Sequence, residues 1–370
     1  MKRQHTNNDN LICDCKSPYY YLSRYRTVLM GFAILWVVWF HSTVQLDFFH
    51  IDFLNAFFKS IKESGYGGVD IFLLVSGMGI YNSLEKNEIS KYIKNRFKRI
   101  TPVWYSFLII SIILGHFFFQ IDYLKSEILG FVTYTGYWLD MQNQGNWYVY
   151  AIILFYLVSP VFHSLIKNSK NKLLTTIILV IISLLVSVAF IGRFRVNIFD
   201  CKLLAFSRVP IFIIGMYISS SLKNKPIKRF YWVIMLLCLT LGISVILICH
   251  HFLYDYMWSH GLLWYPFIII APTLSLLAAK FFDLTYKVLR PFFSLISIFG
   301  KASLEILLAS DFLFDNFSKL NITIFSERIT SIIVVLLGIM FGIAFHYFID
   351  FILKRMDAII LKRKRRIENA

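Results

Sequence analysis

One histidine, His41, comes directly after an unbroken apolar run, GFAILWVVWF. An imidazole ring exchanges a proton near neutral pH, so a histidine is a frequent general base. Burial disfavours the charged ring and keeps it in the neutral form that a base needs. The alternative is an inert histidine that only hydrogen-bonds a neighbouring helix. The residue by itself leaves both interpretations open.

A second polar site interrupts the apolar segment GYGGVDIFLLVSGMGIY, residues 65–81. Asp70 follows a glycine cluster, and Ser76 and Gly77 belong to a small-residue face of the same segment. Small residues let helices pack closely or border a narrow channel. Helix packing explains the glycines, whereas a carboxylate inside a membrane is costly and indicates a functional position.

Two later segments also carry charges. Arg208 lies in SRVPIFIIGMY, and Lys301 and Glu305 are one helical turn apart in GKASLEILLASDF. Each is a candidate functional residue under the same argument. The alternative for Lys301 and Glu305 is a structural ion pair.

The basic stretch KNRFKRITPVW, residues 94–104, is suited to binding an anion. Thr101 is a good N-cap and Pro102 fits a first turn, so a helix is predicted to begin there. Helix N-termini attract anions, and Arg96 and Arg99 stand just before this one. The functional interpretation is a phosphate-bearing cytoplasmic cofactor; the alternative is ordinary positive charge on a cytoplasmic loop.

The segments that carry these residues are long and apolar. The chain of 370 residues is 58% hydrophobic and 16% charged, with a mean hydropathy of +0.64. We therefore predict an all-α polytopic membrane protein with about ten transmembrane helices. The predicted spans are 27–46, 66–84, 102–120, 145–166, 173–192, 203–221, 231–250, 261–280, 292–314 and 329–353.

The distribution of basic residues predicts the topology. Of the 38 lysines and arginines, 28 fall in the two termini and alternate loops, and 8 in the opposite loops. Both termini are therefore predicted to be cytoplasmic. The predicted parts are a cytoplasmic tail (1–26), a transmembrane domain (27–353) and a basic cytoplasmic tail (354–370).

Charge and cysteine content exclude other classes. The net charge of +17 is dispersed over loops, so no compact basic domain predicts nucleic-acid binding. The five cysteines form no CxxC pair and no zinc spacing, so neither a metal site nor a disulfide framework is expected.

An ordered set of these stretches resembles the acyltransferase-3 family of bacterial membrane O-acyltransferases. The matching stretches are the run ending in Phe40-His41, GGVDIFLLVSG (67–77), RFKRITP (96–102), GNWYVYAIILFYLVSP (145–160), RVPIFIIG (208–215) and GKASLEILL (300–308).

The resemblance implies about ten helices in the bacterial cytoplasmic (inner) membrane. It implies transfer of an acyl group, often acetyl, from cytoplasmic acyl-CoA to a hydroxyl of an envelope glycan or its lipid-linked precursor. His41 matches the family's essential histidine, and Arg96 and Arg99 match the arginines thought to serve the acyl donor. Membrane lipid and the glycan acceptor are the expected partners.

The chain departs from the family pattern at three positions. Met30 replaces an arginine eleven residues before the histidine, Phe40 replaces an acidic residue, and Ser310 stands where a second histidine often ends the late motif. The partner of His41 is therefore undefined. Asp70, Glu305 and Asp311 are the candidates to orient the imidazole or the acceptor.

The leading hypothesis is acyl transfer with His41 as general base. In it, Ser76 and Gly77 border the path of the donor arm, and the acceptor contacts are assigned to Trp147, Arg208 and Asp311. A glycan or lipid transporter or flippase would use the same intramembrane charges. A non-catalytic membrane scaffold is the third possibility, and the oligomeric state is left open.

Overall fold

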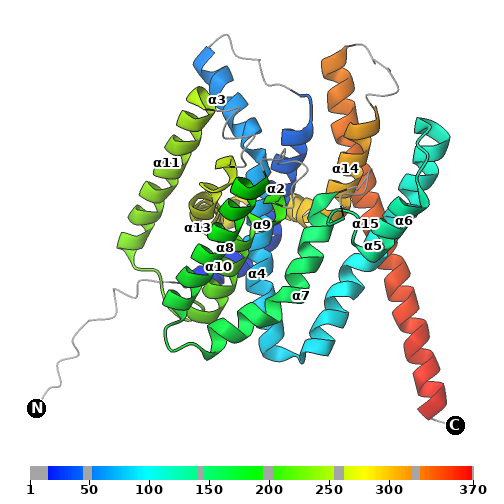
Figure 1. Ribbon diagram of the computed structural model, residues 1–370, viewed down its shortest axis with the longest axis horizontal. Coiled ribbons are helices and arrows are strands. Elements are labelled where there is room, and N and C mark those ends of the chain that lie inside the picture. The colour runs from blue at the N-terminus through cyan, green and yellow to red at the C-terminus, as the bar shows by residue number, and fades with distance from the viewer. Residues whose placement is uncertain are drawn as a thin grey trace, which may run out of the picture.

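The computed structural model describes residues 16–44, 52–139, 146–194, 203–253, 262–317 and 326–368. Within these ranges the chain is helical and contains no β-strand, which confirms the predicted all-α class (Figure 1). The elements are α1 (Pro18–Arg24), α2 (Arg26–His41), α3 (Asp52–Glu63), η1 (Gly65–Gly67), α4 (Gly68–Lys86), α5 (Ile89–Phe119), α6 (Lys125–Thr133), α7 (Trp147–Asn168), α8 (Lys172–Phe194), α9 (Leu203–Phe206), α10 (Val209–Ser221), α11 (Arg229–Phe252), η3 (Leu262–Trp264), α13 (Phe267–Lys301), α14 (Ser303–Phe317) and α15 (Glu327–Glu368).

The protein is a polytopic membrane protein. Among the described residues, eight helices are long and apolar enough to cross a bilayer, and α2 is a shorter apolar helix of 16 residues. Every one of the ten predicted spans overlaps a helix. The span predicted at 292–314 is divided, because α13 ends at Lys301 and α14 begins at Ser303.

Two predicted boundaries are wrong. The helix predicted to begin at Thr101 begins at Ile89, so Pro102 lies inside α5. A proline in a helix removes one hydrogen bond but does not always end the helix, and here the ladder continues on both sides. The last helix continues past 353 to Glu368.

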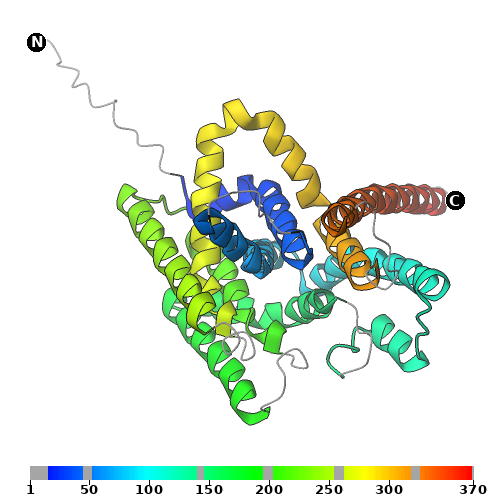
Figure 2. The ribbon, with the colours of Figure 1, turned by 90° about the horizontal axis from the view of Figure 1, so that it is seen from above.

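Helix α2 lies at the centre of the fold. It packs against α4, α13 and α14, and Figure 2 shows the arch of α13 (yellow) around it. Two glycines permit this packing. A Cβ atom at Gly31 would lie 2.1 Å from the carbonyl oxygen of Ile296, and one at Gly300 would lie 1.8 Å from that of Thr27.

The two sides of the bundle carry different connections. In Figure 1 the turns joining α4 to α5 and α7 to α8 lie at the lower edge, with the C-terminal end of α15. The ends of α3, α6 and α14 lie toward the upper edge. We refer to these as the basic side and the opposite side, because the lower turns belong to the arginine- and lysine-rich loops.

Candidate functional site

His41 is the last residue of α2, at the opposite side of the bundle. The helix ends there because Ser42 is extended (φ −75°, ψ 156°) and its hydroxyl donates to the Trp39 carbonyl at 2.7 Å. The His41 side chain is exposed, and its ring lies edge-on to Phe40 with the centroids 4.9 Å apart. The ring is therefore accessible to a substrate and is not enclosed between two packed helices.

A carboxylate from another helix lies within electrostatic reach of His41. Helix α14 begins beside the start of α2, where Gly300 approaches Thr27. At the other end of α14, Asp315 is within electrostatic reach of His41, the last residue of α2. The two helices therefore run in the same direction. Asp315 was not among the predicted candidates, although it follows Asp311 by one helical turn on the same face.

A pocket of about 340 Å³ lies beside this end of α14. Asp311 and Asp315 line it together with Asn146, whose amide donates to Asp311 at 2.9 Å. Trp104 and Phe312 contribute aromatic walls. Carboxylate, amide and aromatic groups together suit a polyhydroxylated molecule, because they supply hydrogen-bond partners and flat apolar faces.

The neighbouring Trp147 does not line this pocket. It is the first residue of α7, half-buried, with its ring 6.2 Å from that of Tyr148. The pocket residue is instead Asn146, which caps α7 by accepting from the Tyr148 amide at 3.0 Å. The cap fixes the Asn146 side chain between two helices, a role that its sequence position did not reveal.

Asp70 and Arg208 bind each other in the interior. Their side chains are 4% and 1% exposed and form a hydrogen-bonded ion pair between α4 and the residue before α10. The guanidinium also lies over Trp264 at 5.4 Å and over Tyr66 at 5.9 Å. The ion pair gives both charges a structural role, in place of separate catalytic and substrate-binding positions, although Nε of Arg208 has no hydrogen-bond partner among the described residues.

Glu305 is paired with a histidine that the sequence did not suggest. It is buried and accepts from Nδ1 of His346, on α15, at 2.9 Å, whereas Lys301 is exposed. Glu305 precedes Asp315 by ten residues, about 15 Å along α14. Glu305 therefore lies too far along α14 from Asp315 to orient His41.

Three arginines gather near the basic side. Arg96 and Arg99 of α5 both lie within electrostatic reach of Arg26, at the start of α2. Among the described residues, none of them forms an ion pair with a carboxylate. Like charges held together without a counterion repel, so this arginine cluster is arranged for an anion from outside the chain.

Aromatic rings and a backbone oxygen hold Arg96 in place. Its guanidinium lies 5.4 Å from the Tyr92 ring centroid and 5.6 Å from that of Tyr156, and it donates to the Gly79 carbonyl at 3.4 Å. Its buried Nε has no hydrogen-bond partner among the described residues. Gly79 lies beside Arg26, and a Cβ there would be in ordinary contact with Nη1 of that arginine, at 3.5 Å.

Arg26 was missed because it does not stand at the family's position. The expected arginine is replaced by Met30, but Arg26 precedes it by one turn on the same face of α2. Its side chain joins Arg96 and Arg99, a position that spacing along the chain alone does not indicate.

Ser76 and Gly77 have different neighbours. Ser76 lies next to Tyr148, whose ring is within electrostatic reach of Arg26 and Arg99. A Cβ at Gly77 would lie 2.2 Å from the Phe212 carbonyl oxygen, so Gly77 permits the close packing of α4 on α10. Ser76 therefore borders the arginine cluster, and Gly77 serves helix packing.

Comparison with protein families gives one match. Residues 27–350 match the acyltransferase-3 model, described as an acyltransferase domain. The chain belongs to the acyltransferase-3 family. No curated protein and no solved structure matched the chain. The membership supports an acyltransferase activity in a multi-pass membrane protein.

Proposed function

We propose that this acyltransferase-3 protein is an O-acyltransferase of the bacterial cytoplasmic membrane. It moves an acyl group, in our proposal acetyl, from cytoplasmic acyl-CoA to a hydroxyl of an envelope glycan. His41 takes the proton from the acceptor hydroxyl as its oxygen attacks the thioester carbonyl. The carbon–sulfur bond then breaks, and CoA leaves as the thiolate.

The observation that carries this proposal is the arrangement along α2. Arg26 and His41 stand at opposite ends of one helix, 15 residues and therefore about 22 Å apart. The arginine cluster suits the CoA phosphates, which guanidinium groups bind through charge-assisted hydrogen bonds. The extended pantetheine arm of the donor then runs along α2 and presents the thioester to His41.

The pocket lined by Asp311, Asp315 and Asn146 is the proposed acceptor site. It adjoins the end of α14 whose Asp315 acts on His41, so a bound sugar would hold a hydroxyl near the imidazole. Asp315 is the proposed positioning residue for that ring. A carboxylate beside an imidazole fixes its orientation and stabilises the imidazolium that forms.

Comparison of surface glycans from wild-type and deletion cells by mass spectrometry tests the proposal. We expect the glycan of the deletion strain to reach the surface but to lack one acyl group, whose mass identifies it. A transporter would give a different result, because the glycan itself would be missing from the surface. An unchanged glycan would exclude this class of acceptor.

The arginine cluster should determine donor affinity. Replacing Arg26, Arg96 or Arg99 by alanine removes charged hydrogen bonds worth about 1.5–3 kcal/mol each, so the Kd for acyl-CoA should rise roughly 10- to 100-fold. Binding is measured by calorimetry on purified protein. Lys223→Ala, at an exposed position in another basic loop, is the matched control. Equal weakening by the control would indicate bulk charge rather than a site.

The acceptor pocket should control the KM for the glycan. Asp311→Ala leaves the Asn146 amide without its partner, and we expect the acceptor KM to rise about 10-fold, the effect of one lost hydrogen bond of roughly 1.4 kcal/mol. The KM for acyl-CoA should not change. Asp122→Ala, at an exposed carboxylate near α6, is the control. A larger change in donor KM than in acceptor KM would contradict the assignment.

A further inference from the structure

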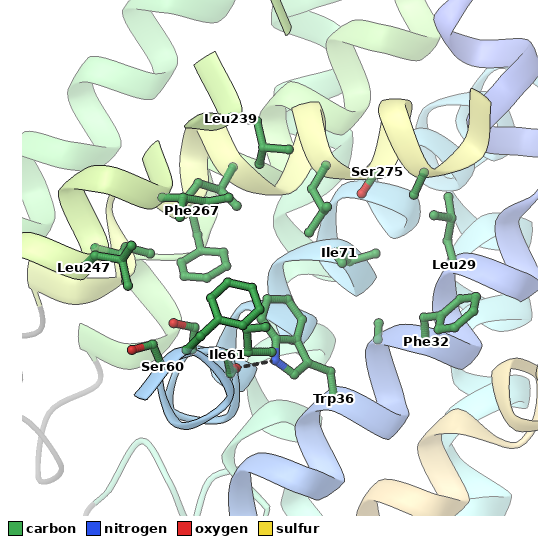
Figure 3. Close-up of a pocket in the computed structure, with 18 of the residues that line it drawn as sticks. Leu29, Phe32, Trp36, Ser60, Ile61, Ile71, Leu239, Leu247, Phe267 and Ser275 are labelled. Atoms are coloured by element: carbon green, nitrogen blue, oxygen red, sulfur yellow. Dashed lines mark hydrogen bonds between the residues drawn. The ribbon is translucent and has the colours of Figure 1, made fainter. Parts of the chain in front are cut away.

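Two cavities in the described part of the chain differ in what they can bind. The larger, of about 540 Å³, lies between α2, α3, α4, α11 and α13, and apart from three serines its lining is hydrocarbon or aromatic (Figure 3). The indole of Trp36 donates there to the Ile61 carbonyl at 2.7 Å, so its N–H is already used. A sugar would lose its hydrogen bonds to water in such a cavity. The acceptor pocket, of about 340 Å³, has polar groups that replace those bonds.

Ser111 of α5 lines the acceptor pocket with an unused hydroxyl. The residue is 7% exposed, and its Oγ has no hydrogen-bond partner among the described residues. A buried hydroxyl without a partner is costly, so its place in a pocket wall indicates that a ligand supplies the partner. A serine hydroxyl donates one hydrogen bond and accepts others, and it therefore matches a sugar hydroxyl in either direction.

Asp311 lines the same pocket from α14 and has one unused oxygen. Its Oδ2 accepts from the amide of Asn146 at 2.9 Å, and none of the described residues donates to its Oδ1. An ionised carboxylate only accepts hydrogen bonds, so Oδ1 needs a donor such as a sugar hydroxyl. A carboxylate, sulfate or phosphate on the ligand would instead bring another acceptor and a like charge to this oxygen.

The lining of the acceptor pocket offers no cation for an acidic ligand. Its described residues include no lysine, arginine or histidine, but two aspartates, Asp311 and Asp315. Within the described part of the chain, Asp311 forms no ion pair with a basic side chain. His41 is within electrostatic reach of Asp315, but it has to be neutral to take a proton, so it is no counterion before the reaction. An acidic group would therefore be desolvated without a partner, which is costly.

Aromatic rings form much of the remaining wall. Trp104 is 1% exposed and its indole N–H donates to the Phe131 carbonyl at 3.0 Å, so it presents only ring surface to the pocket. Phe107 and Phe312 meet edge to face, with their ring centroids 6.1 Å apart. Flat apolar faces beside a few polar groups suit one face of a sugar ring. The pocket is at the small end of the range of about 300–1,000 Å³ for ligand sites, so it takes a short piece of glycan.

We propose that the acceptor pocket takes a neutral sugar unit and excludes acidic sugars, and that Ser111 and Asp311 select it. The hydroxyl of Ser111 and the unused oxygen of Asp311 bind hydroxyls of the neutral unit. A uronic acid, a sialic acid or a phosphorylated sugar is rejected, because its acidic group meets carboxylates and no cation. This inference rests on the proposed acyl transfer and adds the class of the acceptor to it.

The position of the acyl group in the native glycan tests this class. Glycan from wild-type cells is fragmented by tandem mass spectrometry, and the acylated sugar unit is identified by its mass. We expect a neutral hexose, deoxyhexose or N-acetylhexosamine. An acyl group on an acidic or phosphorylated unit would overturn this inference and leave acyl transfer intact. A glycan that has the same acylation in wild-type and deletion cells would instead contradict the proposed function.

Competition measures the selectivity of the pocket. Acyl transfer to isolated glycan by the full-length protein is inhibited with methyl glycosides of glucose, galactose and mannose, or with the uronic acids of the same three sugars. We expect the uronic acids to inhibit at least 10-fold less well. Asp311→Asn keeps the shape of the side chain but removes its charge, and it should reduce this difference at least 5-fold. Asp122→Asn, at an exposed carboxylate outside the pocket, should not. Equal inhibition by both sets, or a difference that survives Asp311→Asn, would overturn the proposal.

A cation added to the pocket gives the reverse test. Ile121 lines the pocket from the connection between α5 and α6, where a lysine interrupts no helix. Ile121→Lys should improve inhibition by the uronic acids at least 5-fold and change inhibition by the neutral glycosides little. Leu124→Lys, at an exposed position of the same connection outside the pocket, is the matched control. Unchanged inhibition by the uronic acids in Ile121→Lys would exclude charge as the property that selects the acceptor.

Ser111 is tested by removal of its hydroxyl alone. Ser111→Ala should raise the KM for the glycan roughly 5-fold, the effect of one lost hydrogen bond. The KM for acyl-CoA and the Tm should not change, because no described residue loses a partner. The matched control is Ser310→Ala, since Ser310 is also buried without a described partner but does not line the pocket. An equal effect of the two changes, or a wild-type KM in Ser111→Ala, would remove Ser111 from the acceptor site.

Discussion

Substitution of His41 by alanine is expected to lower the rate of acyl transfer by 10²- to 10⁴-fold, the usual contribution of a general base. The acceptor hydroxyl would then lose its proton only to water while it attacks the thioester. The affinity for acyl-CoA should stay within about 2-fold of wild type, because the arginine cluster is about 22 Å away along α2. Rate is measured as acyl transfer to isolated glycan, and affinity by calorimetry.

The control for this variant is His116→Ala. His116 is an exposed histidine that lies 3.1 Å from Asp122, outside the acceptor pocket. It should transfer the acyl group at the wild-type rate. Transfer by a folded His41→Ala protein at the wild-type rate would exclude the general-base role and would favour the transporter or scaffold interpretation.

Asp315 should act only through His41. Asp315→Asn is expected to slow transfer about 10-fold, and Asp315→Glu should recover part of that loss. In the His41→Ala background the same change should have no further effect, because the two residues form one unit in a double-mutant cycle. An additive loss in the double variant would mean that Asp315 contacts the acceptor independently of the imidazole.

The fold could be predicted from composition because a bilayer leaves few solutions. Long apolar segments must be helical to satisfy their backbone groups, so the ten predicted spans overlap helices. The boundaries at Thr101 and at 353 failed for a shared reason. Outside the apolar core, helix ends depend on tertiary contacts, such as the bond of 2.7 Å between Lys98 and Asp357 that joins the extensions of α5 and α15.

The residues of the candidate site are recognisable in the sequence where one residue type carries the proposed chemistry, and not where a partner comes from a distant segment. His41, Arg96 and Arg99 stand out locally. Arg26, Asp315 and the bond from His346 to Glu305 depend on which helices are neighbours, and spacing along the chain does not contain that information. Asp70 is a different case, because a charge in an apolar segment can indicate a buried partner, here Arg208, as well as catalysis.

The pair of Asp70 and Arg208 should dominate stability. Asp70→Ala leaves a buried guanidinium without its counterion, and breaking a buried ion pair in this way costs about 3–5 kcal/mol. We expect a lower Tm in detergent and a lower yield of folded protein. Lys98→Ala, which breaks an exposed pair, should cost only about 0–1 kcal/mol.

Removing both charges separates a structural role from a catalytic one. The double variant Asp70→Leu, Arg208→Met leaves no unpaired charge, and replacing a buried pair by apolar residues is often neutral. We expect it to recover most of the stability that Asp70→Ala loses, and with it acyl transfer within about 10-fold of wild type, a difference of roughly 1.4 kcal/mol in the barrier. A double variant that is stable yet inactive would return Asp70 and Arg208 to the reaction itself, because stability would then no longer account for their effect.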